Sequence, residues 1–84
     1  MKHTYMTHGT CARKIEFDLE DGVLHNVVFT NGCNGNLKAI AKLVEGMPAE
    51  RVEAILRGNT CGMKPTSCAD QLAIAVRQAL DEEA

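Results

Sequence analysis

The chain has 84 residues and a formal net charge of −2, which is enough for one small domain. Only 19 residues are Leu, Ile, Val or Phe, so the core is thin, and domains of this size often depend on a metal, disulfides or oligomerisation. The small net charge argues against a nucleic-acid binder, and no apolar run approaches the roughly 18 residues of a membrane span.

The first third of the chain predicts strands. In residues 12–20, Ile15, Phe17 and Leu19 alternate with charged residues, which is typical of a half-buried strand. Residues 23–30 form a second β-rich run. We expect a hairpin with a three-residue loop, 20–22, in which Gly22 takes the left-handed conformation. The segment 2–7 is expected to add a third antiparallel strand.

The length of this loop sets the register of the hairpin. A three-residue loop puts Phe17 opposite His25, on the apolar face, and Cys11 opposite Asn31. Cys11 and Cys33 then lie close together at the open end of the hairpin. A two-residue loop would turn apolar side chains of the second strand outward, so we prefer the register that buries more apolar surface.

Three helices are predicted to follow. The first has apolar residues at helical spacing over 37–44 and ends at Gly46. The second begins after Pro48, ends at Gly58 and is expected to bury three side chains. These are Val52, Ile55 and Leu56.

The third predicted helix runs from about residue 68 to 82. Ser67 is its expected N-cap, and Asp70 occupies the capping-box position three residues later. Its acidic end opposes the helix dipole, so we expect that end to fray. The predicted inner stripe consists of Leu72, Ala75, Val76, Ala79 and Leu80. The expected fold is therefore α+β: one domain, 1–84, with a small antiparallel sheet of two to three strands followed by three helices packed on one face.

Four cysteines fall at junctions between these elements: Cys11, Cys33, Cys61 and Cys68. Five of the seven glycines lie within three residues of a cysteine. The N-terminus lacks the apolar segment of a secretory signal, so we expect a cytoplasmic protein with reduced thiols. Helix N-termini favour thiolates, the form that binds metal. We predict that the four cysteines bind one metal, with zinc as the first choice and an iron–sulfur cluster as the alternative. The competing interpretation is that they are buried as small hydrophobic residues.

The three histidines are weaker candidates. His8 stands three residues before Cys11 in HGTC and could be a ligand or support one. His3 lies on a predicted strand surface or at the chain end, and His25 lies on the predicted apolar face. We leave all three out of the predicted metal site.

The run Pro65–Leu72 resembles the signature of the TSCPD domain family, a Thr-Ser-Cys-Pro-Asp motif. Thr66, Ser67, Cys68 and Asp70 match it, and Ala69 replaces the proline. That proline would fit a first helical turn, so its replacement concerns helix initiation more than chemistry.

The whole chain resembles the short stand-alone, four-cysteine branch of this family, with Cys33 in NGCNGN and Cys61 in TCG. Related domains lie at the C-terminus of cobalamin-dependent ribonucleotide reductases. The resemblance therefore implies a role connected with ribonucleoside-diphosphate reduction and DNA synthesis. We do not expect reductase activity of the chain itself, because 84 residues cannot form the cofactor-bearing barrel of these enzymes. The order of Cys11, Cys33 and Cys68 is also similar, more faintly, to that of U-type iron–sulfur scaffold proteins.

Three functional hypotheses follow. The first is a four-cysteine metal-binding protein accessory to nucleotide reduction or redox metabolism. The second is a thiol/disulfide domain that serves a ribonucleotide reductase or another redox enzyme, with Cys61 and Cys68 as the exchanging pair. The third is an interaction module with structural cysteines, whose exposed apolar helix face binds a partner or a second copy in a homodimer. None of them involves nucleic acid or a membrane.

Overall fold

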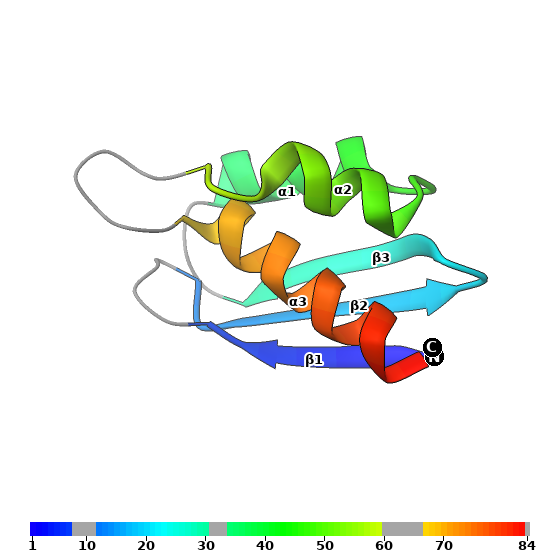
Figure 1. The fold of residues 1–84 in the computed structure, drawn as a ribbon. Coiled ribbons are helices and arrows are strands. Elements are labelled where there is room, and N and C mark those ends of the chain that lie inside the picture. Colours follow the sequence, from blue (N-terminus) through cyan, green and yellow to red (C-terminus); the bar gives the residue numbers. More distant parts are fainter. Residues whose placement is uncertain (8–11, 31–33, 60–66, 84) are drawn as a thin grey trace.

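The computed structural model describes residues 1–7, 12–30, 34–59 and 67–83. Three antiparallel strands form one sheet in the order β1-β2-β3, and the helices lie over one face of it (Figure 1). The elements are β1 (Lys2–Met6), β2 (Lys14–Glu20), β3 (Val23–Thr30), α1 (Asn34–Val44), α2 (Ala49–Leu56) and α3 (Cys68–Glu83). This confirms the α+β fold predicted from the sequence, with the N-terminal segment as the third strand.

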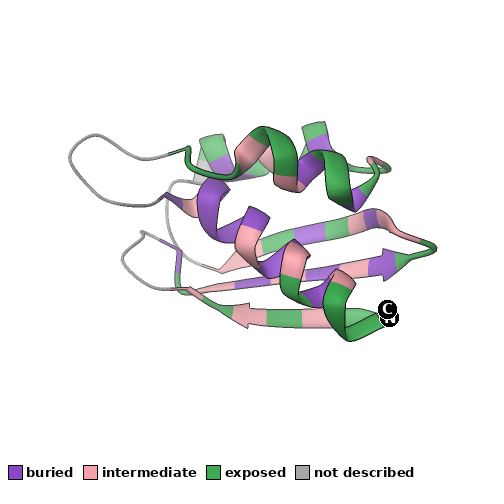
Figure 2. Cartoon of the chain, viewed as in Figure 1, coloured by how far each residue is buried: buried purple, intermediate pink, exposed green. Residues whose placement is uncertain are grey.

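The alternation along β2 defines the buried face of the sheet. Ile15, Phe17 and Leu19 are each at most 1% exposed, whereas the charged residues between them are only partly buried (Figure 2). Full burial of such a side chain stabilises a fold by about 1.5–3 kcal/mol. The helices supply the other half of the core through Val44, Ala49, Val52, Leu72, Ala75, Val76 and Ala79.

The loop between β2 and β3 has two residues, so the predicted three-residue loop and its register are wrong. Asp21 and Gly22 have positive φ angles of 50° and 76°. Two successive positive φ angles are typical of a tight hairpin turn whose twist matches that of the strands it joins. Leu19 consequently pairs with Leu24, where the predicted register had Val23.

A bulge at Asn26 reconciles this turn with an apolar inner face. Asn26 has a φ of 55°, and the pairing of β2 with β3 shifts between Glu16 and Asp18. An extra residue in one strand moves the following side chains to the other face. Leu24 and Val27, three positions apart, are therefore both buried, with exposed fractions of 0% and 7%. Strict alternation without a bulge would turn Val27 outward after a two-residue loop, which is why the sequence pattern favours the longer loop.

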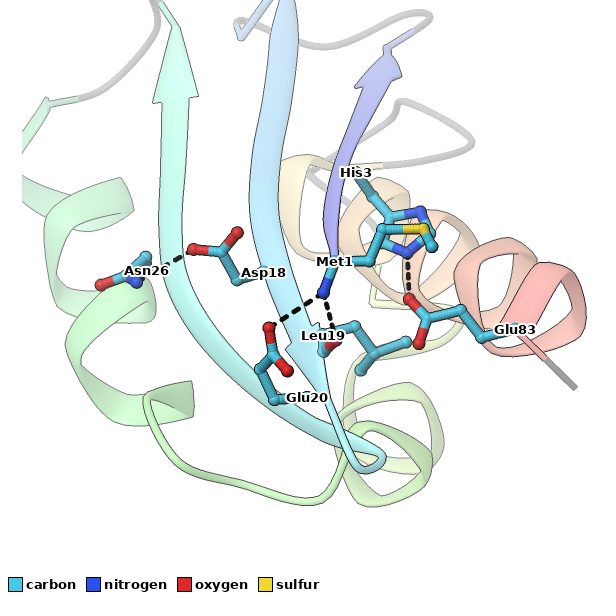
Figure 3. Close-up of polar contacts among 7 residues, drawn as sticks. All are labelled: Met1, His3, Asp18, Leu19, Glu20, Asn26 and Glu83. Atoms are coloured by element: carbon cyan, nitrogen blue, oxygen red, sulfur yellow. Dashed lines mark hydrogen bonds and ion pairs between the residues drawn. The ribbon is translucent and has the colours of Figure 1, made fainter.

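His25 does not lie on the apolar face as predicted. Its side chain is 38% exposed, and its Nδ1 lies 2.6 Å from Oε2 of Glu45, just after α1. Glu45 Oε1 also accepts a hydrogen bond from the Asn26 N–H at 2.8 Å. The Asn26 side-chain amide donates to Asp18 Oδ2 at 3.0 Å (Figure 3). These contacts hold the bulge from both neighbouring elements.

The helix boundaries agree closely with the predicted ones. Gly46 and Gly58 follow α1 and α2 with φ angles of 76° and 83°, where a glycine avoids the strain that a Cβ would add. Ile55 was expected to be buried, but it is 56% exposed. Within the described part of the chain, no helix has both the length and the apolar character needed to cross a membrane.

The acidic end of α3 stays helical through Glu83, contrary to the expected fraying. Glu83 Oε2 lies 2.5 Å from Nε2 of His3, and Glu82 Oε2 lies 3.4 Å from Nδ1 of the same ring. The His3 ring also stacks on Phe17, with ring centroids 5.6 Å apart. Figure 3 shows the imidazole turned toward the end of α3. The edge strand β1 thereby holds the last turn of α3.

Candidate functional site

Of the four predicted metal ligands, Cys68 is the one that lies among the described residues. It is the first residue of α3, is half-buried and carries a free thiol. Cys11, Cys33 and Cys61 lie outside the described residues, as does His8. Across the described ranges, no group of three or more His, Cys, Asp or Glu side chains could hold a metal ion.

Ser67 caps the helix that begins at Cys68, as predicted. The N–H of Asp70 donates to Ser67 Oγ at 3.1 Å, and the N–H of Gln71 donates to the Ser67 carbonyl at 2.8 Å. Such a cap satisfies an N–H that has no partner within the helix. The Ser67 hydroxyl also donates to the carbonyl of Asn59.

Asp70 joins the start of α3 to the end of α2. Its Oδ1 accepts a hydrogen bond from the N–H of Gly58 at 2.7 Å, and the residue is only 7% exposed. The sequence predicted Asp70 for its place within the capping box and missed this longer contact. The signals for it were the glycine that ends α2 and the acidic residue of the signature motif.

The cysteine-bearing connections start and finish at one end of the molecule. Figure 1 shows the start of β2, the end of β3 and the first turns of α1 and α3 at this end. There the N–H of Arg13 donates to the carbonyl of Thr30 at 2.8 Å, and the N–H of Thr7 donates to the carbonyl of Arg13 at 3.2 Å. We call this region the cysteine end. It combines strand ends with the N-termini of two helices.

Both described histidines are engaged with glutamates. His3 contacts Glu82 and Glu83, and His25 contacts Glu45. His3 belongs to the first residues of β1, and the start of β1 lies at the end of the sheet opposite the cysteine end (Figure 1). These contacts agree with leaving both residues out of the predicted ligand set.

The face of the sheet away from the helices carries paired charges beside the exposed apolar residues Met6 and Val28. Lys2 and Lys14 lie 3.3 Å and 3.5 Å from the carboxylate of Glu16. The pKa of Glu16 is lowered, first by its hydrogen bond with Lys2 and then by the positive charge of Lys14. This face is a solvated surface with paired charges.

An apolar groove lies between α1 and α2. Leu43 and Ile55 are its most exposed side chains, with exposed fractions of 74% and 56%. The other residues that line it are Ile40, Val44, Met47, Val52 and Leu56. Exposed apolar surface of this kind often marks an interaction site.

The chain was compared with protein-family models, curated proteins and solved structures. No curated protein and no solved structure is significantly similar to the chain. The family model of the TSCPD domain matches residues 1–80, which confirms the resemblance seen in the signature motif. This match supports a link to the ribonucleotide reductases, the connection that the resemblance implies. The chain belongs to the TSCPD domain family.

Proposed function

We propose that the chain is a small metal-binding protein in which Cys11, Cys33, Cys61 and Cys68 bind one zinc ion. Four thiolates are a complete ligand set for tetrahedral structural zinc. The protein would act as an accessory to nucleotide reduction or a related redox process, with a ribonucleotide reductase or another redox enzyme as its partner. Family membership supports that connection.

The observation that carries the proposal is that the described residues flanking the cysteine-bearing connections lie together at the cysteine end. Cys11 adjoins Ala12, and Cys33 adjoins Asn34 at the start of α1. Cys61 is two residues beyond Asn59 in the sequence. The Asn59 carbonyl accepts a hydrogen bond from the hydroxyl of Ser67, which precedes Cys68. A residue adds at most about 3.8 Å of Cα–Cα distance, so the chain tethers each thiol to this end. A zinc ion there would join the strands to the helices of a thin core.

Metal analysis of protein purified without oxygen tests this proposal. We expect one zinc ion per chain in the wild type and a loss of most of it in Cys11→Ser, Cys33→Ser, Cys61→Ser and Cys68→Ser. Met63→Ser, a control between Cys61 and Cys68 in the sequence, should keep its zinc. A folded, metal-free wild type would contradict the proposal. If the analysis finds iron and sulfide instead of zinc, the iron–sulfur alternative, which uses the same thiolates, replaces the zinc proposal.

A second candidate function is thiol–disulfide exchange by Cys61 and Cys68. The hydrogen bond between Ser67 and Asn59 supports this candidate, because Asn59 precedes and Ser67 follows residues 60–66 in the chain. Formation of the disulfide would release two protons and pass two electrons to the partner redox enzyme. Mass spectrometry after mild oxidation should show a reversible Cys61–Cys68 disulfide, and its absence would exclude this candidate.

A third candidate is an interaction module whose α1–α2 groove binds a second copy of the chain. The exposure of Leu43 and Ile55 favours it, since small domains often gain apolar burial by association. Leu43→Lys should then reduce dimerisation measured by sedimentation. Val28→Lys is the matched control, because Val28 is 54% exposed but lies outside this groove. A wild type that stays monomeric at all concentrations tested would exclude the homodimer.

A further inference from the structure

The outer edge of β3 is covered along the first part of its length. β3 is an edge strand, because the described strands pair in the order β1-β2-β3. The segment that joins α1 to α2 covers its start, where the Leu24 N–H donates to the Met47 carbonyl at 2.9 Å. Glu45 accepts the N–H of Asn26 at 2.8 Å. Beyond the bulge, residues 27–30 have no strand on their outer side among the described residues, and we call this stretch the open edge.

The backbone groups of Phe29 point toward the open edge. Backbone groups alternate in direction along a strand, and antiparallel partners that are not hydrogen-bonded to each other point them apart. In β2, the N–H and carbonyl of Leu19 bond on the β1 side, so those of Ile15, four residues away, point the same way. Phe29 pairs with Ile15 and consequently directs its N–H and carbonyl outward. The next carbonyl, that of Thr30, points inward and accepts the N–H of Arg13.

The open edge lacks the features that usually keep an edge strand from pairing. Charged residues, proline and coverage by another element have this effect in natural sheets. Residues 27–30 are Val-Val-Phe-Thr, a run with high β-propensity and with neither charge nor proline. The other edge strand, β1, carries Lys2 and His3, whose side chains pair with glutamates. An uncovered edge of this kind can accept an added strand.

A mostly apolar groove lies beside the open edge, between β3 and α1. Its volume is about 250 Å³, and its lining consists of Val27, Val28, Phe29, Leu37, Lys38 and Ala41. When an extended peptide adds a strand to a sheet, backbone hydrogen bonds supply affinity and pockets for alternate side chains supply specificity. The groove provides such a pocket next to the outward backbone groups of Phe29.

Lys38 gives this groove a positive charge. Its side chain is exposed and forms no ion pair with the residues that the structure describes, whereas Lys2 and Lys14 share the carboxylate of Glu16. Lys42, one turn further along α1, is likewise exposed and without an ion pair in the described ranges. Complementary charge selects partners and suppresses wrong ones. The groove therefore favours an occupant that brings a carboxylate to Lys38.

A second copy of the chain does not supply that carboxylate. Residues 27–30 contain no acidic side chain. Antiparallel pairing of two open edges would also place both α1 helices on the same face of the joined sheet, and with them Lys38 and Lys42 of each copy. Like charges brought together at an interface oppose association. The charge thus favours a different protein whose docking segment is acidic.

We propose that the open edge binds an extended segment of a partner protein, in which an apolar and an acidic residue stand two positions apart. The segment adds a strand to the sheet, and its backbone bonds to the N–H and carbonyl of Phe29. Side chains two positions apart lie on the same face of a strand. The apolar side chain enters the groove, and the acidic one pairs with Lys38. This site consists of described residues alone and does not involve the proposed metal.

A labelled synthetic peptide tests the proposal on the full-length protein. The probe repeats Thr-Val-Thr-Glu, so that valine and glutamate share one face, and its control repeats Thr-Val-Thr-Lys. We expect tighter binding of the glutamate peptide in fluorescence anisotropy at low ionic strength, where surface charges are weakly screened. Amide exchange at Phe29 should slow on binding, because its N–H gains an acceptor. Exchange at Val28 and Thr30, whose N–H groups point toward β2, should change little.

Reversal of one charge separates the role of Lys38 from that of net charge. Lys38→Glu should bind the glutamate peptide about tenfold more weakly and prefer the lysine peptide, because a surface attraction becomes a repulsion. Arg51→Glu makes the same change in charge on α2, outside the groove, and should bind the glutamate peptide like the wild type. Both side chains are exposed, so both variants should fold.

Three results would overturn the proposal. The first is a wild type that does not bind the glutamate peptide or that binds both peptides equally. The second is slower exchange in β1 instead of at Phe29, which would put the added strand on the other edge of the sheet. The third is slower exchange at Phe29 with rising protein concentration and no peptide, which would make a second copy the occupant. None of these measurements depends on a metal, so the proposed function stands or fails separately.

Discussion

Asn26 controls the register of the hairpin through a single backbone angle. Its φ of 55° lies in the left-handed region, which costs most side chains roughly 1–2 kcal/mol and asparagine less. Glu45 accepts its N–H, and Asp18 accepts its side-chain amide. One residue thus decides which side chains of β3 face the helices.

Replacement of Asn26 should reveal this cost. Asn26→Val places a β-branched side chain at positive φ and removes the bond to Asp18, so we expect a loss of about 2 kcal/mol in the free energy of unfolding. Asn26→Gly accepts the same angle and keeps the N–H bond to Glu45, so its loss should stay below about 1 kcal/mol. Urea denaturation measures both. Equal losses would show that backbone strain does not operate at this position.

Glu45 should make stability depend on pH in the acid range. Its pKa is lowered from the ordinary value of 4.5, first by the N–H of Asn26 and then by the hydrogen bond with His25. A lowered pKa in the folded state gives stability that is complete above the unfolded pKa and is lost as the pH falls through the folded pKa. The thermal unfolding midpoint should therefore decrease as the pH is lowered below about 4.5. This decrease should be less steep in Glu45→Gln. An unchanged acid slope in that variant would count against the contact.

At the scale of elements, most of the helices and strands were predicted from local sequence patterns. The alternation along β2 and the helical spacing in α1 and α3 depend on neighbours a few residues away, so they can be read from the sequence. The register of β3 depends on a bulge held by Glu45, which lies 19 residues from Asn26. The exposure of Ile55 depends on how α1 and α2 pack. Neither is specified by local spacing.

The contact between β1 and the end of α3 was also not predictable from local sequence patterns. It joins His3 to Glu83 across 80 residues. A His3→Ala variant loses the stack on Phe17 and both glutamate contacts, so we expect it to destabilise the fold by about 1–2 kcal/mol. Hydrogen exchange should accelerate first in residues 79–83.

Lys2→Ala serves as the matched control for His3→Ala. Lys2 is a neighbour on β1 whose exposed side chain pairs with Glu16 on the other face of the sheet. Exposed ion pairs contribute about 0–1 kcal/mol, and this one makes no contact with α3. Faster exchange at residues 79–83 in both variants would show that the whole edge strand, and not His3, holds the helix.

At the scale of the whole molecule, the two ends of the sheet differ. His3 and the last turn of α3 close one end, and the described residues that flank the cysteine-bearing connections lie at the other. The position of Ser67 as N-cap was predictable because a cap is a local signal. The bond of Asp70 to Gly58 was not, because it joins two helices through residues 12 apart. The sequence therefore indicated the cap of α3, but not the hydrogen bond that joins the first turn of α3 to the end of α2.

On the proposed function, removal of the zinc ion should loosen the cysteine end before the rest of the protein. A metal bound by both halves of the chain stabilises the folded state that contains its site. After treatment with a chelator, we expect faster amide exchange in the first turn of α3 and at residues 28–30. Exchange at the turn 21–22 and at residues 79–83 should change much less. Uniform acceleration along the chain would contradict a metal that acts locally at this end.

X-ray absorption at the zinc edge of the anaerobically purified protein tests the central claim most directly. The claim is that four cysteines from the strand and helix halves of the chain share one metal ion. It predicts four sulfur ligands at about 2.3 Å, without nitrogen or oxygen in the first shell. Fewer than four sulfurs, or a folded protein that contains no metal, would contradict it.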